Sequence, residues 1–323
     1  MHQSSKKQCM EDVITINGKK IYPGESAEVS MSNLSFPTRT IIDVPVFVFR
    51  SLHAGPRVLF QAGMHGEEVN GVEVVRSLLK REDIQNPRCG SIILIPIVNV
   101  VSFLMNARDL PDGRDLNRCF PGSKNGSMGS RLAYDLMKNV ISQIDFGVDF
   151  HTGGAKINNY PQIRCVFEDE RNIELSNAFS APFVLNAPYR DKSLRKEAAK
   201  KGKHILVFEG GEAQRFNSFS INEGTNGCLR MLHNLGIIDT QVEKSNSIVL
   251  KDTTWIRAKT SGMFRTNKKF GAFVEKDSVI GKIVSPYAEK ETFLFTPCDG
   301  FLIGINNQPI VNEGDALMNI GVE

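Results

Sequence analysis

Short apolar runs and helical apolar stripes alternate along the first 240 residues. The run RVLFQA at 57–62 and the almost wholly apolar run at 91–100 are typical of strands covered on both faces. Between and after them, apolar residues recur at helical spacing. The pattern predicts strands up to about residue 50 and then, in chain order, strand 57–62, helix 69–80, strand 91–100, helix 131–144, strand 146–150, helix 174–179, strand 182–186, helix 193–201 and strand 204–208. This alternation indicates an α/β domain with a parallel or mixed sheet.

The pattern changes near residue 243. From there on, glycines separate short apolar runs, and no helical stripe is visible. We therefore expect two domains: residues 1–245, including the N-terminal strands to about 50, and a small all-β domain at 246–323.

Composition narrows the class of protein. The 323 residues are 41% hydrophobic and carry a net charge of +3, which excludes a disordered chain and argues against a nucleic-acid binder. The six cysteines are scattered without a C-x-x-C pair, as expected of free thiols in a reducing compartment. The polar N-terminus resembles no signal peptide, and no apolar run reaches membrane-spanning length. We expect a soluble, cytoplasmic protein that contacts no membrane.

Three predicted strands end in residues that suit a metal hydrolase. His65 and Glu68 follow the first of these strands as H-x-x-E, His151 lies at the end of the second, and Glu209 follows the third. In open α/β sheets, ligands bind at the edge formed by the carboxyl ends of the strands, which is where these residues lie. Taken alone, H-x-x-E is also compatible with a surface histidine before a helix N-terminus that favours an acid. Three ligands with an open position are typical of catalytic zinc, with Glu209 as the acid–base group.

A polar loop at 106–122 follows the apolar strand at 91–100. It contains Arg108, Arg114, Asn117 and Arg118 between prolines and glycines. Guanidinium groups bind carboxylates with two parallel hydrogen bonds and stabilise oxyanions. The alternative is a surface loop held by Asp–Arg pairs, each of which contributes little.

Together, the segments GMHGEEVNG, RDLPDGRDLNRCFPG, DFHTGG and FEGGE resemble the succinylglutamate desuccinylase/aspartoacylase family of the zinc carboxypeptidase-like superfamily. The resemblance covers the chain to about residue 240. It implies a mixed sheet flanked by helices, and the C-terminal part resembles a biotinyl/lipoyl-like β-module. That module lacks a carrier lysine, since its turn reads TPCDGFL.

The resemblance also implies a role for each matching residue. His65, Glu68 and His151 would bind one Zn²⁺ per chain, and Glu209 would be the general base. Either Arg108 or Arg114 would polarise the scissile carbonyl, because the loop carries an additional DLPDGR. The implied substrate-binding residues are Asn117, Arg118 and Arg195.

Among the remaining residues, Trp255 is expected to pack, and His53, His204 and His233 belong to no motif. Tyr287, or another residue of the β-module, is a candidate to reach the substrate.

The predicted function is zinc-dependent hydrolysis of the amide bond in a small N-acyl amino acid. A peptide carboxypeptidase with the same metal centre is the first alternative, because both reactions cleave an amide beside a carboxylate. A non-catalytic binding protein is the second. Assembly into homo-oligomers and the identity of the acyl group stay open.

Overall fold

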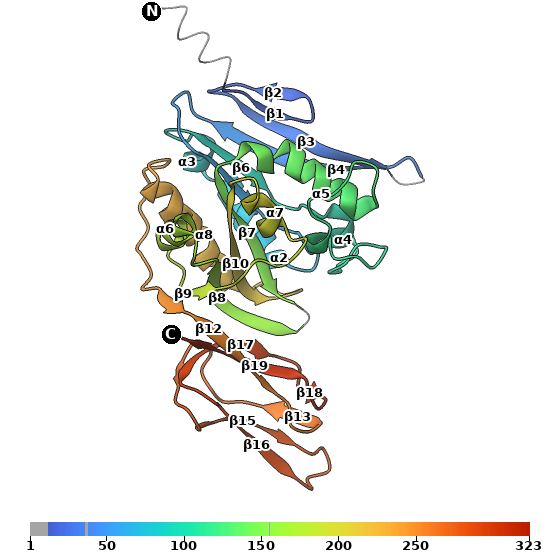
Figure 1. The fold of residues 1–323 in the computed structure, drawn as a ribbon, viewed down its shortest axis with the longest axis vertical. Coiled ribbons are helices and arrows are strands. Elements are labelled where there is room, and N and C mark those ends of the chain that lie inside the picture. The colour runs from blue at the N-terminus through green and yellow to red at the C-terminus, as the bar shows by residue number, and fades with distance from the viewer. Residues whose placement is uncertain (1–11, 36–37, 155) are drawn as a thin grey trace, which may run out of the picture.

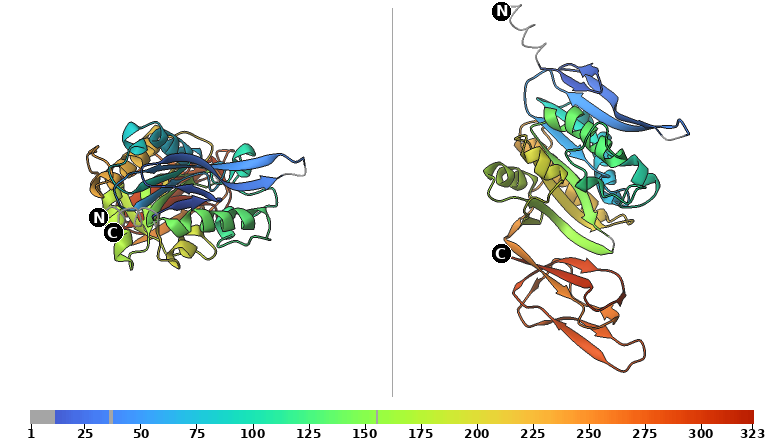
Figure 2. Two further views of the ribbon diagram at one scale, coloured as in Figure 1. Left: turned by 90° about the horizontal axis from the view of Figure 1, so that it is seen from above. Right: turned by 45° about the vertical axis from the view of Figure 1, so that its right-hand side comes forward.

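The computed structural model describes residues 12–35, 38–154 and 156–323. The molecule is elongated, with the first strands at one end and the C-terminal strands at the other (Figure 1). Figure 2 shows the same two ends and the helices packed about the central strands. No helix in the described ranges is long and apolar enough to span a membrane.

A large mixed sheet organises the fold. Its order is β12-β19-β17-β8-β10-β7-β5-β6-β4-β3. The central strands β6, β5, β7 and β10 are parallel, whereas β4 and β8 flank them antiparallel. The bounds are β3 (Ser26–Ser35), β4 (Ile41–Arg50), β5 (Arg57–Gln61), β6 (Ser91–Ile95), β7 (Phe146–Gly153), β8 (Ile157–Cys165), β10 (His204–Glu212), β12 (Asp252–Arg257), β17 (Gly300–Asn306) and β19 (Ala316–Val322).

Helices cover both faces of the parallel strands, so these strands carry apolar residues on both sides. One face packs against α2 (Val69–Leu79), α3 (Glu82–Gln85), α6 (Glu170–Phe179) and α8 (Ser218–Asn234). The other face packs against α5 (Met128–Asn139) and α7 (Leu194–Ala199). The hairpin β1 (Ile14–Ile16) and β2 (Lys19–Ile21) belongs to the second core. The shorter helices are α4 (Val100–Leu104), η1 (Leu116–Arg118) and η2 (Ile141–Gln143).

The C-terminal part is all β with its own apolar core, as predicted. Its second sheet has the order β16 (Glu291–Phe295), β15 (Val279–Val284), β13 (Gly262–Arg265), β18 (Ile310–Val311). Two further pairs, β14 (Phe273–Val274) with β17 and β11 (Ile248–Leu250) with β9 (Phe183–Asn186), belong to the large sheet.

The two parts of the chain share main-chain hydrogen bonds. Strand β17 pairs with β8, and β11 pairs with β9, so the large sheet continues past residue 246. The mixed sheet with flanking helices and a separate antiparallel C-terminal sheet confirms the predicted fold class. The division at 245 and 246 stays a prediction.

Several predicted bounds were wrong for local reasons. Strand β6 stops at Ile95, because Pro96 has no N–H and the chain turns so that the Asn99 side chain accepts from Ser102 N and caps α4. Helix α5 ends at Asn139 rather than at 144. Helix α8 was not predicted, since Gly224 and Gly227 interrupt its stripe. The described cysteines are free, as expected.

Helix α8 supports the strands that carry the candidate site, and its approach depends on Gly227. A Cβ at this residue would lie 2.1 Å from the fully buried ring of Phe179. Gly227→Ala should therefore destabilise the protein by about 1–3 kcal/mol, as overpacking does. Chemical denaturation measures the difference.

Asn222→Ala on the exposed side of α8 is the matched control. It should leave stability unchanged or raise it slightly, because alanine favours helix. A Gly227→Ala protein as stable as this control would show that Phe179 can move aside.

Candidate metal centre and substrate cavity

His65 and Glu68 lie in the turn between β5 and α2. Gly63 begins the turn with φ 65°, a conformation that glycine adopts without strain. A Cβ at Gly66 would lie 2.0 Å from the backbone of Ser102, so only glycine lets the turn pass this close to α4. Glu68 then occupies the residue before the first turn of α2. The local backbone thus directs both side chains to the carboxyl edge of the sheet.

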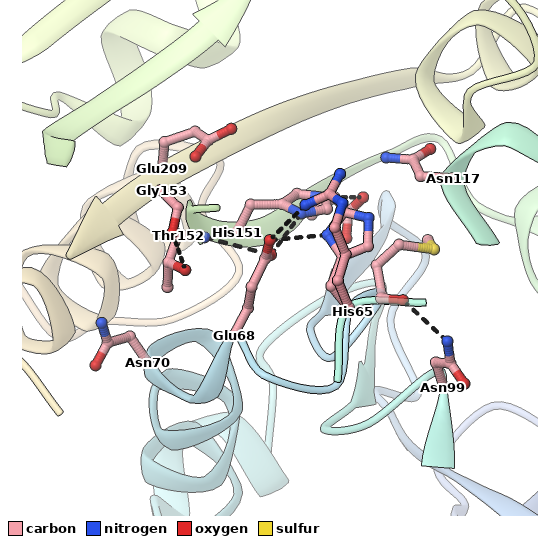
Figure 3. Close-up of polar contacts among 12 residues, drawn as sticks. His65, Glu68, Asn70, Asn99, Asn117, His151, Thr152, Gly153 and Glu209 are labelled. Atoms are coloured by element: carbon pink, nitrogen blue, oxygen red, sulfur yellow. Dashed lines mark hydrogen bonds and ion pairs between the residues drawn. The ribbon is translucent and has the colours of Figure 1, made fainter. Parts of the chain in front are cut away.

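Three side chains converge at this edge. Glu68 bridges two imidazoles: its Oε1 lies 2.8 Å from His65 Nδ1, and its Oε2 lies 2.8 Å from His151 Nδ1. All three residues are buried, and their ligand atoms lie within 4.8 Å of one another. Figure 3 shows them pointing toward one another from the turn after β5 and from β7. Two nitrogens and a carboxylate at this separation can hold a divalent metal ion.

The opposite nitrogen of each imidazole meets a second carboxylate. His65 Nε2 lies 3.0 Å from Asp115 Oδ1, and His151 Nε2 lies 3.0 Å from Asp149 Oδ2. Gln61 Nε2 donates to the other oxygen of Asp149. A carboxylate behind a histidine fixes the proton on the outer nitrogen and leaves the inner Nδ1 free to ligate.

The charge of this cluster suits a cation. With neutral imidazoles, the carboxylates of Glu68, Asp115 and Asp149 and one guanidinium, that of Arg108, leave two negative charges in excess. Burial alone would raise the pKa of Glu68, but His65 and His151, when they are protonated, outweigh burial and hold that pKa far below its usual value. Burial likewise opposes charging of His151, yet Asp149 and Glu68 raise its pKa well above the ordinary value. The donor set therefore fits a divalent metal.

Glu209 lies on β10 beside this cluster. It pairs in register with His151 on the neighbouring parallel strand, so both belong to the same edge of the sheet. Its Oε1 lies 3.1 Å from Arg164 Nη1, and its Oε2 accepts from Asn159 Nδ2 at 3.0 Å. Both partners come from β8, and together they orient the carboxylate at the cavity wall.

The loop after α4 places its arginines differently. Arg108 Nη1 lies 3.4 Å from Glu68 Oε1, and its Nη2 donates to Asp115 at 3.0 Å. Arg114 instead donates to Ser127 Oγ at 3.0 Å, and most of its side chain is exposed. Of the two arginines, Arg108 is the one beside the metal-site candidates.

Asn117 and Arg118 lie in η1 at the cavity. The Asn117 Oδ1 accepts from the backbone N–H of Leu194 at 2.9 Å, which leaves its amide nitrogen toward the cavity (Figure 3). Arg195 also lines the cavity, but it donates to the main-chain oxygens of Arg164, Ala187 and Pro188. These bonds hold the segment before α7 against β8.

One cavity of about 410 Å³ is lined by most of the predicted site residues, namely His65, Glu68, Arg108, Asn117, Arg118, His151, Arg195 and Glu209. Sequence reasoning missed several of its lining residues: Asn159, Arg164, Tyr189, Arg190 and Trp255. It also missed the supporting carboxylates Asp115 and Asp149. Asp149 did have a signal, because it lies two residues before His151 on the same strand and alternation directs both to one face. Tyr287, the suggested contact, is 82% exposed and does not line the cavity.

A mixed α/β sheet with a buried His–Glu–His cluster and a neighbouring glutamate at its carboxyl edge defines a metallohydrolase class. The succinylglutamate desuccinylase/aspartoacylase catalytic-domain model matches residues 54–235, which is more than half of the chain. The chain belongs to this family of hydrolases that remove acyl groups from amide nitrogen.

Known relatives agree with this membership. The chain is 25% identical over 258 residues to N-alpha-acetyl-L-2,4-diaminobutyric acid deacetylase of Halomonas elongata, which covers 74% of this chain and 73% of the relative. The fold of this chain is similar to that of a succinylglutamate desuccinylase/aspartoacylase from Rhodobacter sphaeroides. The TM-score is 0.80 at 24% identity, and the match covers 93% of this chain and 95% of the other. The ectoine utilization protein EutE from Ruegeria pomeroyi gives TM-score 0.79 at 21% identity, with coverage of 90% and 93%.

Asp149 should support metal binding through His151. Asp149→Asn removes the charge behind the imidazole while keeping its size, so affinity for Zn²⁺ should fall about 10- to 100-fold. Calorimetric titration of the metal-free protein measures it.

Asp145→Asn is the matched control, because Asp145 directly precedes the other end of the same strand and accepts from Arg57 N. This variant should bind Zn²⁺ like the parent. Equal affinity in all three proteins would exclude Asp149 from the support of the metal centre.

Proposed function

We propose that this protein is a zinc-dependent deacylase that hydrolyses the amide bond of a small N-acyl amino acid. The observation that carries the proposal is the convergence of His65, Glu68 and His151 beside Glu209 in one cavity. Zinc is the metal of choice because it accepts imidazole nitrogen and carboxylate oxygen and tolerates three protein ligands. When bound, zinc would lower the pKa of water and polarise the acyl carbonyl.

The side chains around the metal site would carry out the proton transfer and stabilise the developing negative charge. Glu209 accepts a proton from the attacking water and later donates it to the leaving nitrogen. Arg108 donates hydrogen bonds to the oxygen that becomes negative when water adds to the acyl carbon. The bond between that carbon and the amide nitrogen then breaks, and a carboxylic acid and an amino acid leave. Asn159 and Arg164 keep the Glu209 carboxylate in place throughout.

The other end of the substrate would be held by Asn117 and Arg118. Both residues line the cavity. A planar guanidinium together with an amide nitrogen suits a carboxylate, because both can donate to its oxygens at once. Fixing the carboxylate orients the amide for attack.

The cavity charge favours an acidic substrate over a basic one. Among the described residues that line the cavity, the carboxylates are those of Glu68 and Glu209, and both already have histidine or arginine partners. A substrate ammonium, as in the N-acetyl-diaminobutyrate that the Halomonas elongata relative is named for, would find no carboxylate without a partner there. The guanidinium groups that line the cavity are those of Arg108, Arg118, Arg164, Arg190 and Arg195.

A substrate screen tests the proposal directly. The zinc-loaded protein is assayed with N-acetyl, N-succinyl and longer N-acyl amino acids and, in parallel, with peptides that have a free carboxyl end. Turnover confined to N-acyl amino acids, and highest for the acidic ones, is the expected result. Preferred cleavage of peptides would instead indicate a carboxypeptidase, and zinc binding without turnover of any compound would indicate a binding protein.

Glu209→Gln separates catalysis from metal binding. The amide keeps the size of the side chain but cannot accept the proton, so kcat should fall at least ~10²-fold with unchanged zinc content. Steady-state kinetics and metal analysis on the same preparation check both statements.

The matched control is Glu212→Gln on the same strand. Glu212 contacts Arg215 and Asn307 and should be dispensable for the reaction. A fast Glu209→Gln enzyme together with a slow Glu212→Gln enzyme would assign the general base to Glu212.

Arg118→Lys tests the carboxylate end. Lysine cannot form two parallel hydrogen bonds, so kcat/KM for N-acyl amino acids should fall. The fall should correspond to a loss of about 1.5–3 kcal/mol of transition-state stabilisation. The same substitution should have little effect on the corresponding C-terminal amides, which lack the charge.

Arg114→Lys in the same loop is the control and should preserve both rates, since Arg114 contacts Ser127. Equal losses on acid and amide substrates would show that Arg118 only shapes the loop, because the coupling between the two changes would then be zero.

A further inference from the structure

One residue that lines the cavity comes from the C-terminal part of the chain. Trp255 on β12 lines the cavity together with Glu209 and Asn159. Across the sheet, Trp255 pairs with Asn319, Asn319 pairs with Gly304, and Gly304 pairs with Asn159. Directly paired residues present their side chains on the same face. This row therefore leads from Trp255 to the residue that holds Glu209.

Gly304 leaves room for the indole to reach the cavity. A Cβ on Gly304 would lie 3.7 Å from Trp255 Cη2 and 3.4 Å from Asn159 Oδ1. The tip of the indole thus lies over a residue without a side chain, next to the amide that donates to Glu209 Oε2. A bulky side chain at this residue would occupy the space between the indole and Asn159.

The direction of the substrate assigns a role to this wall. In Figure 3, Asn117 and Glu209 lie on opposite sides of the His–Glu–His cluster. If Asn117 and Arg118 hold the carboxylate and the scissile carbonyl lies at the cluster, the acyl group extends toward the Glu209 side. Apolar lining residues on this side include Trp255, Ile157 on β8 and Val207 on β10. Ile157 and Val207 lie two residues before Asn159 and Glu209 on the same strands, and therefore on the same face of the sheet.

We propose that Trp255 forms the end wall of the acyl pocket and limits the length of the acyl group that the enzyme accepts. The proposal rests on the proposed deacylase function and extends it to a specificity-determining residue supplied by the C-terminal strands. An indole in van der Waals contact with the acyl chain favours short apolar groups and excludes longer ones. Each additional methylene that a pocket accepts or excludes changes kcat/KM about 10- to 200-fold.

The fluorescence of Trp255 can report on ligand binding at this residue, because the chain contains one tryptophan. In the zinc-loaded Glu209→Gln protein, which binds without rapid turnover, N-acetyl and N-butyryl amino acids should change the emission of Trp255. The free amino acid, which lacks the acyl group, should leave that emission unchanged. Emission that responds equally to both, or to neither, would overturn the proposal.

Variants test the size limit. Trp255→Ala should raise the kcat/KM ratio of hexanoyl to acetyl substrates at least tenfold, and Trp255→Phe should give a smaller change in the same direction. Tyr287→Ala, an exposed aromatic residue of the C-terminal part, should leave the ratio unchanged. Trp255→Phe keeps an aromatic ring in the sheet and preserves the test if Trp255→Ala fails to fold.

The outcomes separate this proposal from the function on which it rests. If the parent protein hydrolyses no N-acyl amino acid, the proposed function fails, and the emission titration alone then decides whether acylated ligands reach Trp255. If the parent hydrolyses them and both Trp255 variants keep the parent's hexanoyl-to-acetyl ratio, the function holds and the assignment of Trp255 is wrong.

Discussion

The buried carboxylate of Glu68 is the group on which the site depends. It bridges the inner nitrogens of two imidazoles that come from different strand exits, and it is almost wholly removed from water. A buried carboxylate is costly unless positive charge and hydrogen bonds surround it. Arg108, the Thr152 N–H and the two histidines supply them here. Because these groups come from three separate segments, Glu68 fixes the turn after β5, the end of β7 and the loop after α4 relative to one another.

The outer carboxylates extend the same constraint. Asp115 bonds both His65 and Arg108, so one loop residue positions a metal-ligand candidate and the guanidinium beside it. Asp149 is held in turn by Gln61 on the neighbouring strand β5. Chains of this kind limit the rotation of each ligand, and a metal site needs such rigidity to keep its geometry. The regular spacing of the parallel strands thereby sets the positions of the side chains at their carboxyl ends.

The large sheet also joins the C-terminal strands to the site. Pairing of β17 with β8 sets β12 at a defined distance from β10, and aromatic contacts of Tyr160 with Phe183, Phe219 and Phe270 pack the junction. Main-chain hydrogen bonds and a packed aromatic cluster leave little freedom between the two parts. A residue of the C-terminal strands can therefore line the cavity as reproducibly as one from the parallel core.

The sequence by itself determined most of the alternation of strands and helices, helix α8 excepted, and the all-β C-terminal part. It also determined which residues lie at the carboxyl ends of the central strands: His65, Glu68, His151 and Glu209. These follow from apolar periodicity and from residues adjacent in the chain, which local physics reaches. The tertiary structure decided which arginine of the loop lies beside Glu68, and it brought Asn159, Arg164 and Trp255 to the cavity. Those placements depend on strand order, on the antiparallel direction of β8 and on pairing between residues more than a hundred positions apart, none of which leaves a periodic signal in the chain.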